Sequence, residues 1–324
     1  MDDRVTVIFD RDAAEPSGPD PRLPRFRGGE PHHRRRRALA LAAVALLALV
    51  IGVSAGAGGG GRVRSRVGGG PSTYFARLQV LAGSGQDSLG VQEQTAEGAA
   101  IDRTLTYTPY VRVAGAEHRE VAITFDDGPG PFTPEIVSIL ASEGVPATFF
   151  QVGVLQRYFH DATTEIVSHG YPIGDHTYGH APMSKLTAAE QQSQLIRQIS
   201  AMGNFGAPFP RLFRPPYGLW NATTLKLLHS YKMLMVLWTV DTGDYRVPGS
   251  DAIVRSALAG ARPGAIILMH DAGGQRQETV NALPLIIAGL RARGYQLVTV
   301  PKLLLDNPAP GNQQLPPGLA GGGG

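Results

Sequence analysis

Residues 124–130 read TFDDGPG, and this stretch decides how the C-terminal two thirds of the chain are interpreted. Residues 121–125 are mostly apolar and predict a buried strand, which the Gly-Pro pair that follows must end. Asp126 and Asp127 therefore stand at a strand terminus. Neighbouring side chains of a continuing strand point to opposite faces, but a break here lets both carboxylates face one site. An ordinary Asp-Gly turn is the alternative interpretation.

Outward from this stretch, short apolar runs alternate with segments of helical periodicity. The pattern predicts strands at 121–125, 147–152, 171–174, 211–214, 233–240, 265–269 and 296–300. It predicts helices at 134–143, 161–168, 187–202, 221–230, 250–261 and 280–293, the third with a capping box from Thr187 to Glu190. Strands that alternate with helices indicate βα units and a parallel sheet, and their number favours a barrel. Reactive side chains are then expected at the carboxyl ends of the strands.

A pair of histidines follows the third predicted strand. His176 and His180 stand four residues apart in DHTYGH, a spacing that places two imidazoles on one face of a tight turn. Two histidines and one carboxylate are a common ligand set for a catalytic metal, and the set leaves a coordination position open. Two partly exposed loop histidines are the alternative. The chain has no cysteine, which excludes disulfides, thiolate-bound metals and thiol nucleophiles.

Three more motifs end predicted strands: RPPYG at 214–218, VDTGDY at 240–245 and IILMHD at 266–271. Arg214 is placed to pair with a carboxylate, and Asp244 follows a strongly apolar strand. His270 closes a hydrophobic strand and shares one face of it with Leu268. A surface salt bridge, a plain loop and a core histidine are the respective alternatives.

The order and content of these five motifs resemble the NodB-homology polysaccharide deacetylases, carbohydrate esterase family 4. The resemblance covers residues 116–306 and also includes the connecting stretches ATFFQVG and HDAGG. It implies a distorted (β/α) barrel and a metal-dependent hydrolase that acts on the C–N amide bond of acetylated polysaccharides.

The resemblance also implies the catalytic roles. Asp127, His176 and His180 correspond to the metal ligands, and Zn²⁺ is the favoured ion, with Co²⁺ or another divalent ion as alternatives. Asp126 corresponds to the general base that activates water, and His270 to the general acid that protonates the leaving amine.

Further residues correspond to supporting positions of the family. Arg214 would hold Asp126, and Asp244 would orient His270. The backbone N–H of Tyr217 would help to bind the oxyanion, and Thr177 would brace the histidine loop.

Leu268 and Tyr245 correspond to the wall around the acetyl methyl group. The fourth motif of the family usually ends in Trp, whereas this chain has Tyr245. The exchange bears on acyl preference or substrate length and leaves the reaction type as it is.

Residues 38–57 form an uncharged apolar stretch of 20 residues. As a helix it would span ~30 Å, the thickness of the hydrocarbon core of a bilayer. Four arginines at 34–37 precede it, which predicts a cytoplasmic N-terminus and a catalytic domain outside the cell. Cleavage of a signal peptide near Ala57, which would secrete the protein, is the alternative. We favour the uncleaved anchor because 37 residues are long for the region before a signal sequence.

The net charge of +3 and the pI of about 9.2 raise the question of nucleic-acid binding. Residues 116–306, however, contain 15 basic and 16 acidic residues, so the excess lies before the predicted domain. We therefore expect no nucleic-acid partner. The expected parts are a disordered cytoplasmic tail (1–37), a transmembrane anchor (38–57), a linker or extracellular pre-domain (58–115), the catalytic domain (116–306) and a flexible Pro/Gly tail (307–324).

These observations predict a membrane-anchored, metal-dependent deacetylase that acts on an N-acetylated polysaccharide outside the cell. Peptidoglycan N-acetylglucosamine is the favoured substrate, because the predicted export places the enzyme near a cell wall. The alternatives are an O-acetyl esterase on xylan or another acetylated glycan, and a deacetylase of chitin or exopolysaccharide. A non-catalytic glycan-binding protein is the alternative from a different class; loss of a ligand, base or acid would mark it, and all are present.

Overall fold

The computed structural model describes residues 88–315. The predicted tail at 1–37, the predicted membrane segment at 38–57 and the first part of the predicted linker lie outside the described residues. Between residues 88 and 315, no helix is both long enough and apolar enough to cross a membrane.

The described part is built around one sheet in which all ladders between named strands are parallel. Its order is β1-β6-β5-β4-β3-β2-β8-β7, and β9 also pairs with β2. The strands are β1 (Tyr110–Val111), β2 (Glu120–Asp126), β3 (Thr148–Gln151), β4 (Ile173–Asp175), β5 (Leu212–Phe213), β6 (Leu234–Val236), β7 (Val240–Asp241), β8 (Ala265–His270) and β9 (Gln296–Val298). No ladder joins β7 to β1 among these strands, so the sheet forms a half-barrel and the expected parallel α/β architecture is confirmed.

Alternation along the two long central strands separates the core from the site. On β2, Val121, Ile123 and Phe125 pack into the core cluster that the outer helices share, whereas Thr124 and Asp126 point to the other face. On β8, Leu268 and His270 lie on the inner face, as the sequence predicts. A single strand therefore supplies both the packing energy and the polar groups of the site.

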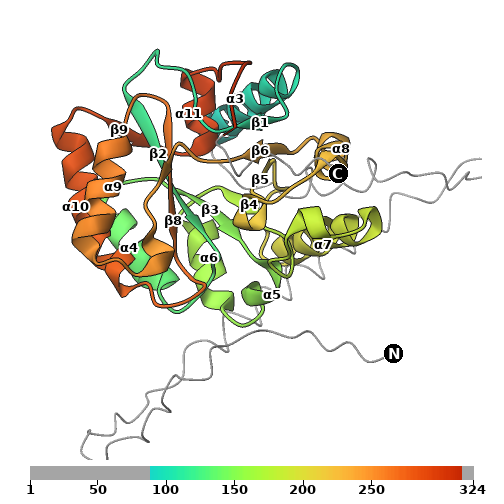
Figure 1. Cartoon of the computed structure of the whole chain (residues 1–324), viewed down its shortest axis with the longest axis horizontal. Coiled ribbons are helices and arrows are strands. Elements are labelled where there is room, and N and C mark those ends of the chain that lie inside the picture. Colours follow the sequence, from blue (N-terminus) through green and yellow to red (C-terminus); the bar gives the residue numbers. More distant parts are fainter. Residues whose placement is uncertain (1–87, 316–324) are drawn as a thin grey trace, which may run out of the picture. The chain divides into compact units, whose positions relative to one another are not determined.

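Helices cover the sheet on the outside (Figure 1). They are α4 (Thr133–Glu143), α6 (His160–Ser168), α7 (Ala188–Gly203), α8 (Ala222–Ser230), α9 (Ser250–Gly260) and α10 (Gln277–Ala292), and the short α5 (Gly153–Gln156) lies at one end of the barrel. The predicted capping box at the start of α7 is confirmed: the Thr187 side chain accepts a hydrogen bond from the Glu190 N–H, and the Glu190 carboxylate accepts one from the Thr187 N–H.

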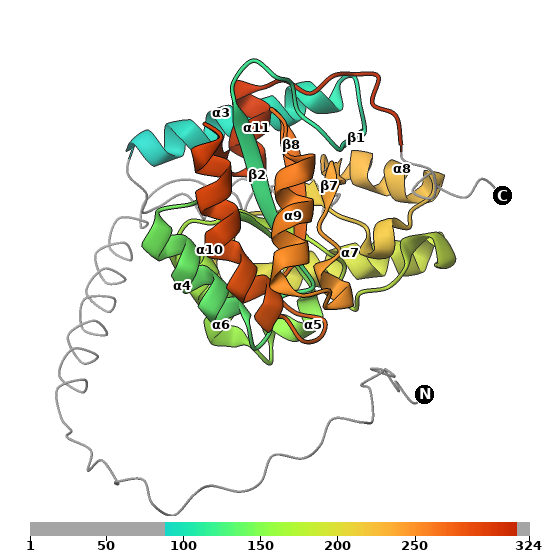
Figure 2. The ribbon, with the colours of Figure 1, turned by 60° about the vertical axis from the view of Figure 1, so that its left-hand side comes forward.

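Two further helices, α3 (Ser88–Leu105) and α11 (Val300–Asp306), close the end of the barrel opposite to α5 (Figures 1 and 2). Ile101 of α3 and Leu303 and Leu304 of α11 complete a second core cluster with inward residues of the strands, including Phe150. The amino ends of the strands are therefore plugged, and the carboxyl ends stay available for chemistry.

Three regions differ from the expected elements. The predicted strand 233–240 is two strands, because it changes its partner. Leu237 N–H donates to the Val111 carbonyl, whereas Thr239 N–H donates to the Ile266 carbonyl on β8. The predicted strand 296–300 ends at Val298, since Thr299 caps α11 instead. The packed unit also begins before residue 116 and continues past residue 306, where the Gln313 side chain accepts hydrogen bonds from Arg112 N–H and Val113 N–H.

Candidate active site

Residues from five strands converge at the carboxyl end of the half-barrel. Asp126 is the last residue of β2 and His270 the last of β8. His176 and His180 follow β4, Arg214 follows β5, and Asp244 begins the short helix η3 (Asp244–Arg246) after β7. The structure thus brings the predicted site residues to one end of the sheet.

The backbone separates the roles of the two neighbouring aspartates. Asp126 still belongs to β2 and is almost completely buried. Asp127 adopts a left-handed conformation with φ of 69°, and its side chain is 17% exposed. The strand therefore ends between the two residues, which lets one carboxylate stay inside the barrel while the other reaches its mouth.

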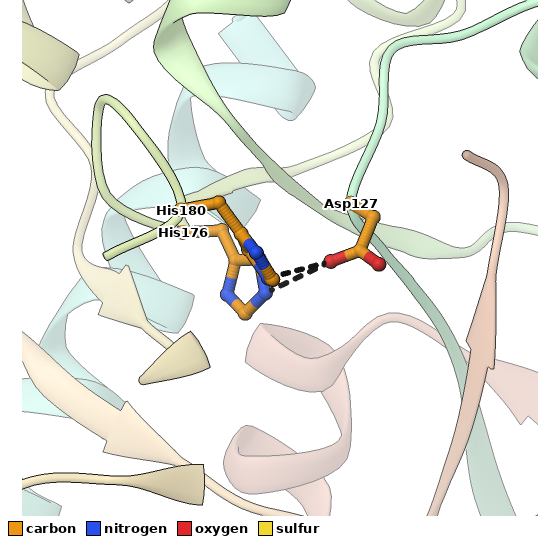
Figure 3. A group of neighbouring side chains, drawn as sticks. All are labelled: Asp127, His176 and His180. Carbon is orange, nitrogen blue, oxygen red and sulfur yellow. Dashed lines mark ion pairs between the residues drawn. The ribbon is translucent and has the colours of Figure 1, made fainter. Parts of the chain in front are cut away.

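Asp127, His176 and His180 form a compact cluster (Figure 3). Asp127 Oδ1 lies 2.9 Å from His180 Nε2 and 3.4 Å from His176 Nε2, and the three potential ligand atoms lie within 4.8 Å of one another. Among residues 88–315, this is the one group of its kind that offers such a set of ligand atoms. Two imidazoles and a carboxylate suit Zn²⁺ and several other divalent ions.

The neighbourhood of His176 fits a metal ligand. Its Nδ1 lies 2.7 Å from the backbone carbonyl oxygen of Arg214, and a carbonyl can only accept a hydrogen bond. Nδ1 therefore carries a proton, and Nε2 is the ring nitrogen that faces Asp127. A second hydrogen bond of this kind fixes the tautomer and the ring orientation of metal-binding histidines.

The charge balance of the cluster favours an ionised Asp127. Burial alone raises the pKa of this carboxyl, but hydrogen bonds from His176 and His180, and the charges of His180 and His270, hold the pKa well below its usual range. The cluster therefore offers an anionic oxygen beside two imidazole nitrogens.

Arg214 holds Asp126 from inside the barrel. The guanidinium Nη1 donates to Asp126 Oδ1 at 2.7 Å and to the Thr124 hydroxyl at 2.8 Å. Its Nε and Nη2 donate to the backbone carbonyls of Val236 and Leu237, so β2 and the end of β6 hold the fully buried side chain. Asp126 Oδ2 is left to face the cluster, 3.9 Å from His176 Nε2.

His270 and Asp244 form the second polar pair of the site. His270 Nδ1 lies 2.8 Å from Asp244 Oδ1, while Asp244 Oδ2 accepts from His270 N–H and from the Thr279 hydroxyl. Burial alone lowers the pKa of His270, but the hydrogen bond and charge of Asp244 and the charges of Asp127 and Asp126 raise it to about 9. His270 is therefore protonated at neutral pH.

Two exposed tyrosines flank these groups. Tyr217 is 63% exposed, has a positive φ of 60° and presents its ring edge-on to His180 at 4.7 Å. Tyr245 is 40% exposed and contacts His270 in the same way at 5.5 Å. Leu268 lies buried on the strand that ends in His270. Two aromatic rings thus border the polar groups, and Leu268 lies on the same face of β8 as His270.

The loop that carries the histidines is fixed by its own backbone. Thr177 has a φ of 65°, its N–H donates to Asp175 Oδ1 at 2.7 Å, and its hydroxyl accepts from Ala181 N–H. Our sequence reasoning missed Asp175, which is fully buried, and burial raises its pKa well above the usual range. Its position beside His176 in DHTYGH was the available signal.

Asp271 was also missed, although it directly follows His270. Its buried carboxylate accepts from the Thr133 hydroxyl at 2.5 Å, and Thr133 in turn accepts from Gly130 N–H. A side chain at Gly128 would collide with the Asp271 carboxylate. Asp271 and Thr133 therefore support the turn that follows the two aspartates.

The mouth of the parallel half-barrel combines a His₂Asp cluster, a buried carboxylate and a protonated histidine. This combination defines a class of α/β hydrolytic sites. The family model described as polysaccharide deacetylase matches residues 114–236. This chain belongs to the polysaccharide deacetylase family.

Named relatives support this assignment. A peptidoglycan-N-acetylglucosamine deacetylase of Bacillus cereus is 37% identical over 186 residues, which are 57% of this chain and 68% of that protein. A chitooligosaccharide deacetylase of a Bradyrhizobium species is 35% identical over 199 residues, 57% of this chain and 90% of that protein. The solved structure of the Bc1960 peptidoglycan N-acetylglucosamine deacetylase covers 61% of this chain and 94% of its own, with a TM-score of 0.59 and 34% identity.

Proposed function

We propose that this protein hydrolyses the acetamide groups of an N-acetylated polysaccharide and releases acetate. One observation carries the proposal: a carboxylate held by a buried arginine and a histidine held by a buried aspartate both border the same His₂Asp cluster. An amide has a poor leaving group, so its hydrolysis needs a base for the attack and an acid for C–N cleavage. The site provides one candidate for each.

Asp127, His176 and His180 would hold a divalent cation, and Zn²⁺ is our proposed ion. When bound, such a cation supplies Lewis acidity to the carbonyl oxygen of the substrate and to water. His176 Nδ1 donates to the Arg214 carbonyl and Thr177 N–H donates to Asp175 Oδ1, and these hydrogen bonds orient the histidine loop before the ion binds.

Asp126 is the proposed general base. Arg214 keeps Oδ1 occupied and fixes the carboxylate, so Oδ2 can take a proton from the attacking water. His270 is the proposed general acid, because its raised pKa keeps the proton that the departing nitrogen requires. Asp244 accepts from Nδ1 and thereby directs Nε2–H toward the substrate.

The remaining predicted residues surround the reacting group. The N–H of Tyr217, whose backbone turns at positive φ beside His180, is proposed to bind the developing oxyanion. Leu268 and Tyr245 are proposed to contact the acetyl methyl group. Thr177 is proposed to keep the histidine loop in shape.

We also propose that peptidoglycan N-acetylglucosamine is the substrate and that residues 38–57 anchor the enzyme with its catalytic domain outside the cell. The names of two relatives agree with the first proposal, and the apolar stretch after four arginines supports the second.

Acetate release from three acetylated substrates tests the proposed function. The purified protein is incubated with peptidoglycan, chitin oligomers and O-acetylated xylan, and free acetate is measured. Release from an N-acetylated glycan supports the proposal. Release from xylan alone would identify an O-acetyl esterase, and release from none would refute a catalytic role.

A further inference from the structure

We infer that the mouth of the site selects a glycan strand that carries carboxylate groups, and that Arg246 is the residue that recognises them. The inference rests on the proposed function and names the substrate class more closely. It concerns a residue that takes no part in the reaction itself.

The side chain of Tyr245 contacts both Arg246 and His270. Arg246 Nη2 donates to the hydroxyl of Tyr245 at 2.8 Å, and the guanidinium carbon lies 5.1 Å from the centre of the Tyr245 ring. The same ring contacts His270 edge-on at 5.5 Å. Tyr245 therefore holds an exposed guanidinium beside His270, where we place a sugar that neighbours the reacting one.

This guanidinium has no carboxylate partner among the described residues, unlike several other arginines. Arg211 pairs with Asp102, and Arg291 pairs with Glu143. The exposed carboxylate that precedes Arg246 is that of Asp241 at the end of β7, and it accepts from the Gly243 N–H at 2.9 Å. A positioned guanidinium with free donors is suited to a fork-shaped contact with a carboxylate.

The histidine side of the site repeats the arrangement. Arg197 of α7 lies 3.9 Å from the ring centre of Tyr178, which stands between the two histidines of the cluster. Arg157, at the end of α5, lies 5.6 Å from the ring centre of Tyr158. No ion pair is found for either arginine within residues 88–315. Positive charge held on tyrosine rings thus occurs on two sides of the site.

The substrates named for the two relatives differ in charge. A chitooligosaccharide offers only hydroxyl and acetamide groups. A peptidoglycan strand carries carboxylates on its lactyl ethers or on the peptides attached to them. A free guanidinium gains more from a charged acceptor than from a neutral one, so the arrangement favours the carboxylate-bearing strand.

Two matched tetrasaccharides test the inference. One is an all-N-acetylglucosamine oligomer, and the other alternates N-acetylglucosamine with N-acetylmuramic acid and so carries free lactyl carboxylates. For the wild-type protein and for Arg246→Gln, kcat/KM is measured on both. We expect the preference for the acidic oligomer to fall about tenfold in the variant, mainly through KM, and Arg246→Lys to retain part of it. Arg255→Gln, an exposed position on α9, is the control and should keep the wild-type preference.

Binding decides the inference independently of turnover. The same oligomers are titrated into Asp126→Asn, with and without Arg246→Gln, by calorimetry at low and high salt. The inference is supported if the protein prefers the acidic oligomer, if salt weakens this preference, and if Arg246→Gln removes it. Equal losses on both oligomers, or no loss, would overturn it. Failure to release acetate from any glycan would refute the proposed function. The titration would still show whether Arg246 recognises carboxylates.

Discussion

The guanidinium of Arg214 contacts the carboxylate of Asp126 at 2.7 Å, and both side chains are buried in the barrel. This ion pair joins the end of β5 to the end of β2 and leaves one oxygen of Asp126 free for the site. It connects the packing of the half-barrel to its proposed chemistry, since each partner alone would be a buried, uncompensated charge.

Arg214→Gln should therefore affect stability and turnover together. Removal of one partner of a buried pair typically costs about 3–5 kcal/mol of unfolding free energy, measured by urea denaturation. The control is Arg291→Gln, which breaks an exposed pair with Glu143 and should cost about 0–1 kcal/mol. Equal costs for the two variants would contradict the assigned role of Arg214.

Asp244→Asn should shift the pH profile of kcat/KM. The hydrogen bond and charge of Asp244, together with the charges of Asp127 and Asp126, raise the pKa of His270 to about 9 against the opposing effect of burial. Without that charge the pKa falls, so the acid loses its proton at lower pH and the alkaline limb moves toward neutrality. Asp241→Asn, which changes an exposed carboxylate three residues earlier at the end of β7, should leave the limb in place. An unmoved limb in Asp244→Asn would mean that His270 is not the acid.

His180→Ala and Asp126→Asn should separate binding of the metal from turnover. His180 Nε2 is one of the three ligand atoms, so its loss should weaken divalent-cation binding by more than about 100-fold, measured by calorimetry. Asp126→Asn should retain the cation but release acetate at least about 100-fold more slowly. If Asp126→Asn loses the cation, Asp126 is the metal ligand and Asp127 the base, contrary to our assignment.

Glu97 should make the attachment of α3 sensitive to pH. Burial raises its pKa to about 7, with help from the charges of Glu93 and Asp306 and against the charge of Lys302. The unfolded chain ionises near 4.5, so between pH 4.5 and 7 the folded state binds more protons. The stabilising contribution is therefore complete below pH 4.5 and lost as the pH rises through about 7.

Hydrogen exchange of α3 at pH 5 and pH 8 measures this effect. After correction for the intrinsic rates, protection should be higher at pH 5 in the wild-type protein and nearly independent of pH in Glu97→Gln. Glu135→Gln, on the exposed face of α4, should behave like the wild type. The same dependence in all three proteins would contradict the role of Glu97.

Much of the site was predictable because its residues stand where strands end. The period of two along β8 places Leu268 and His270 on one face whatever the neighbours are. The break after Asp126 likewise follows from the Gly-Pro pair. These features are local in sequence, so the residue pattern alone carries them.

The remainder depends on tertiary contacts. The α3 helix has few large apolar residues, and it is held through Ile101 against the end of the barrel. The predicted strand 233–240 is uniformly apolar, and only its change of partner near Leu237 divides it. Asp175 and Asp271 act on backbone turns whose position depends on the whole fold.

Chelation followed by reconstitution tests the central claim most directly. Acetate release from an N-acetylated glycan is measured on the protein as purified, after a chelator, and after stoichiometric Zn²⁺ or Co²⁺ is added. Our account predicts that chelation abolishes the release and that the added ion restores it in the wild type but not in His180→Ala. Full acetate release from the chelated protein would contradict the account.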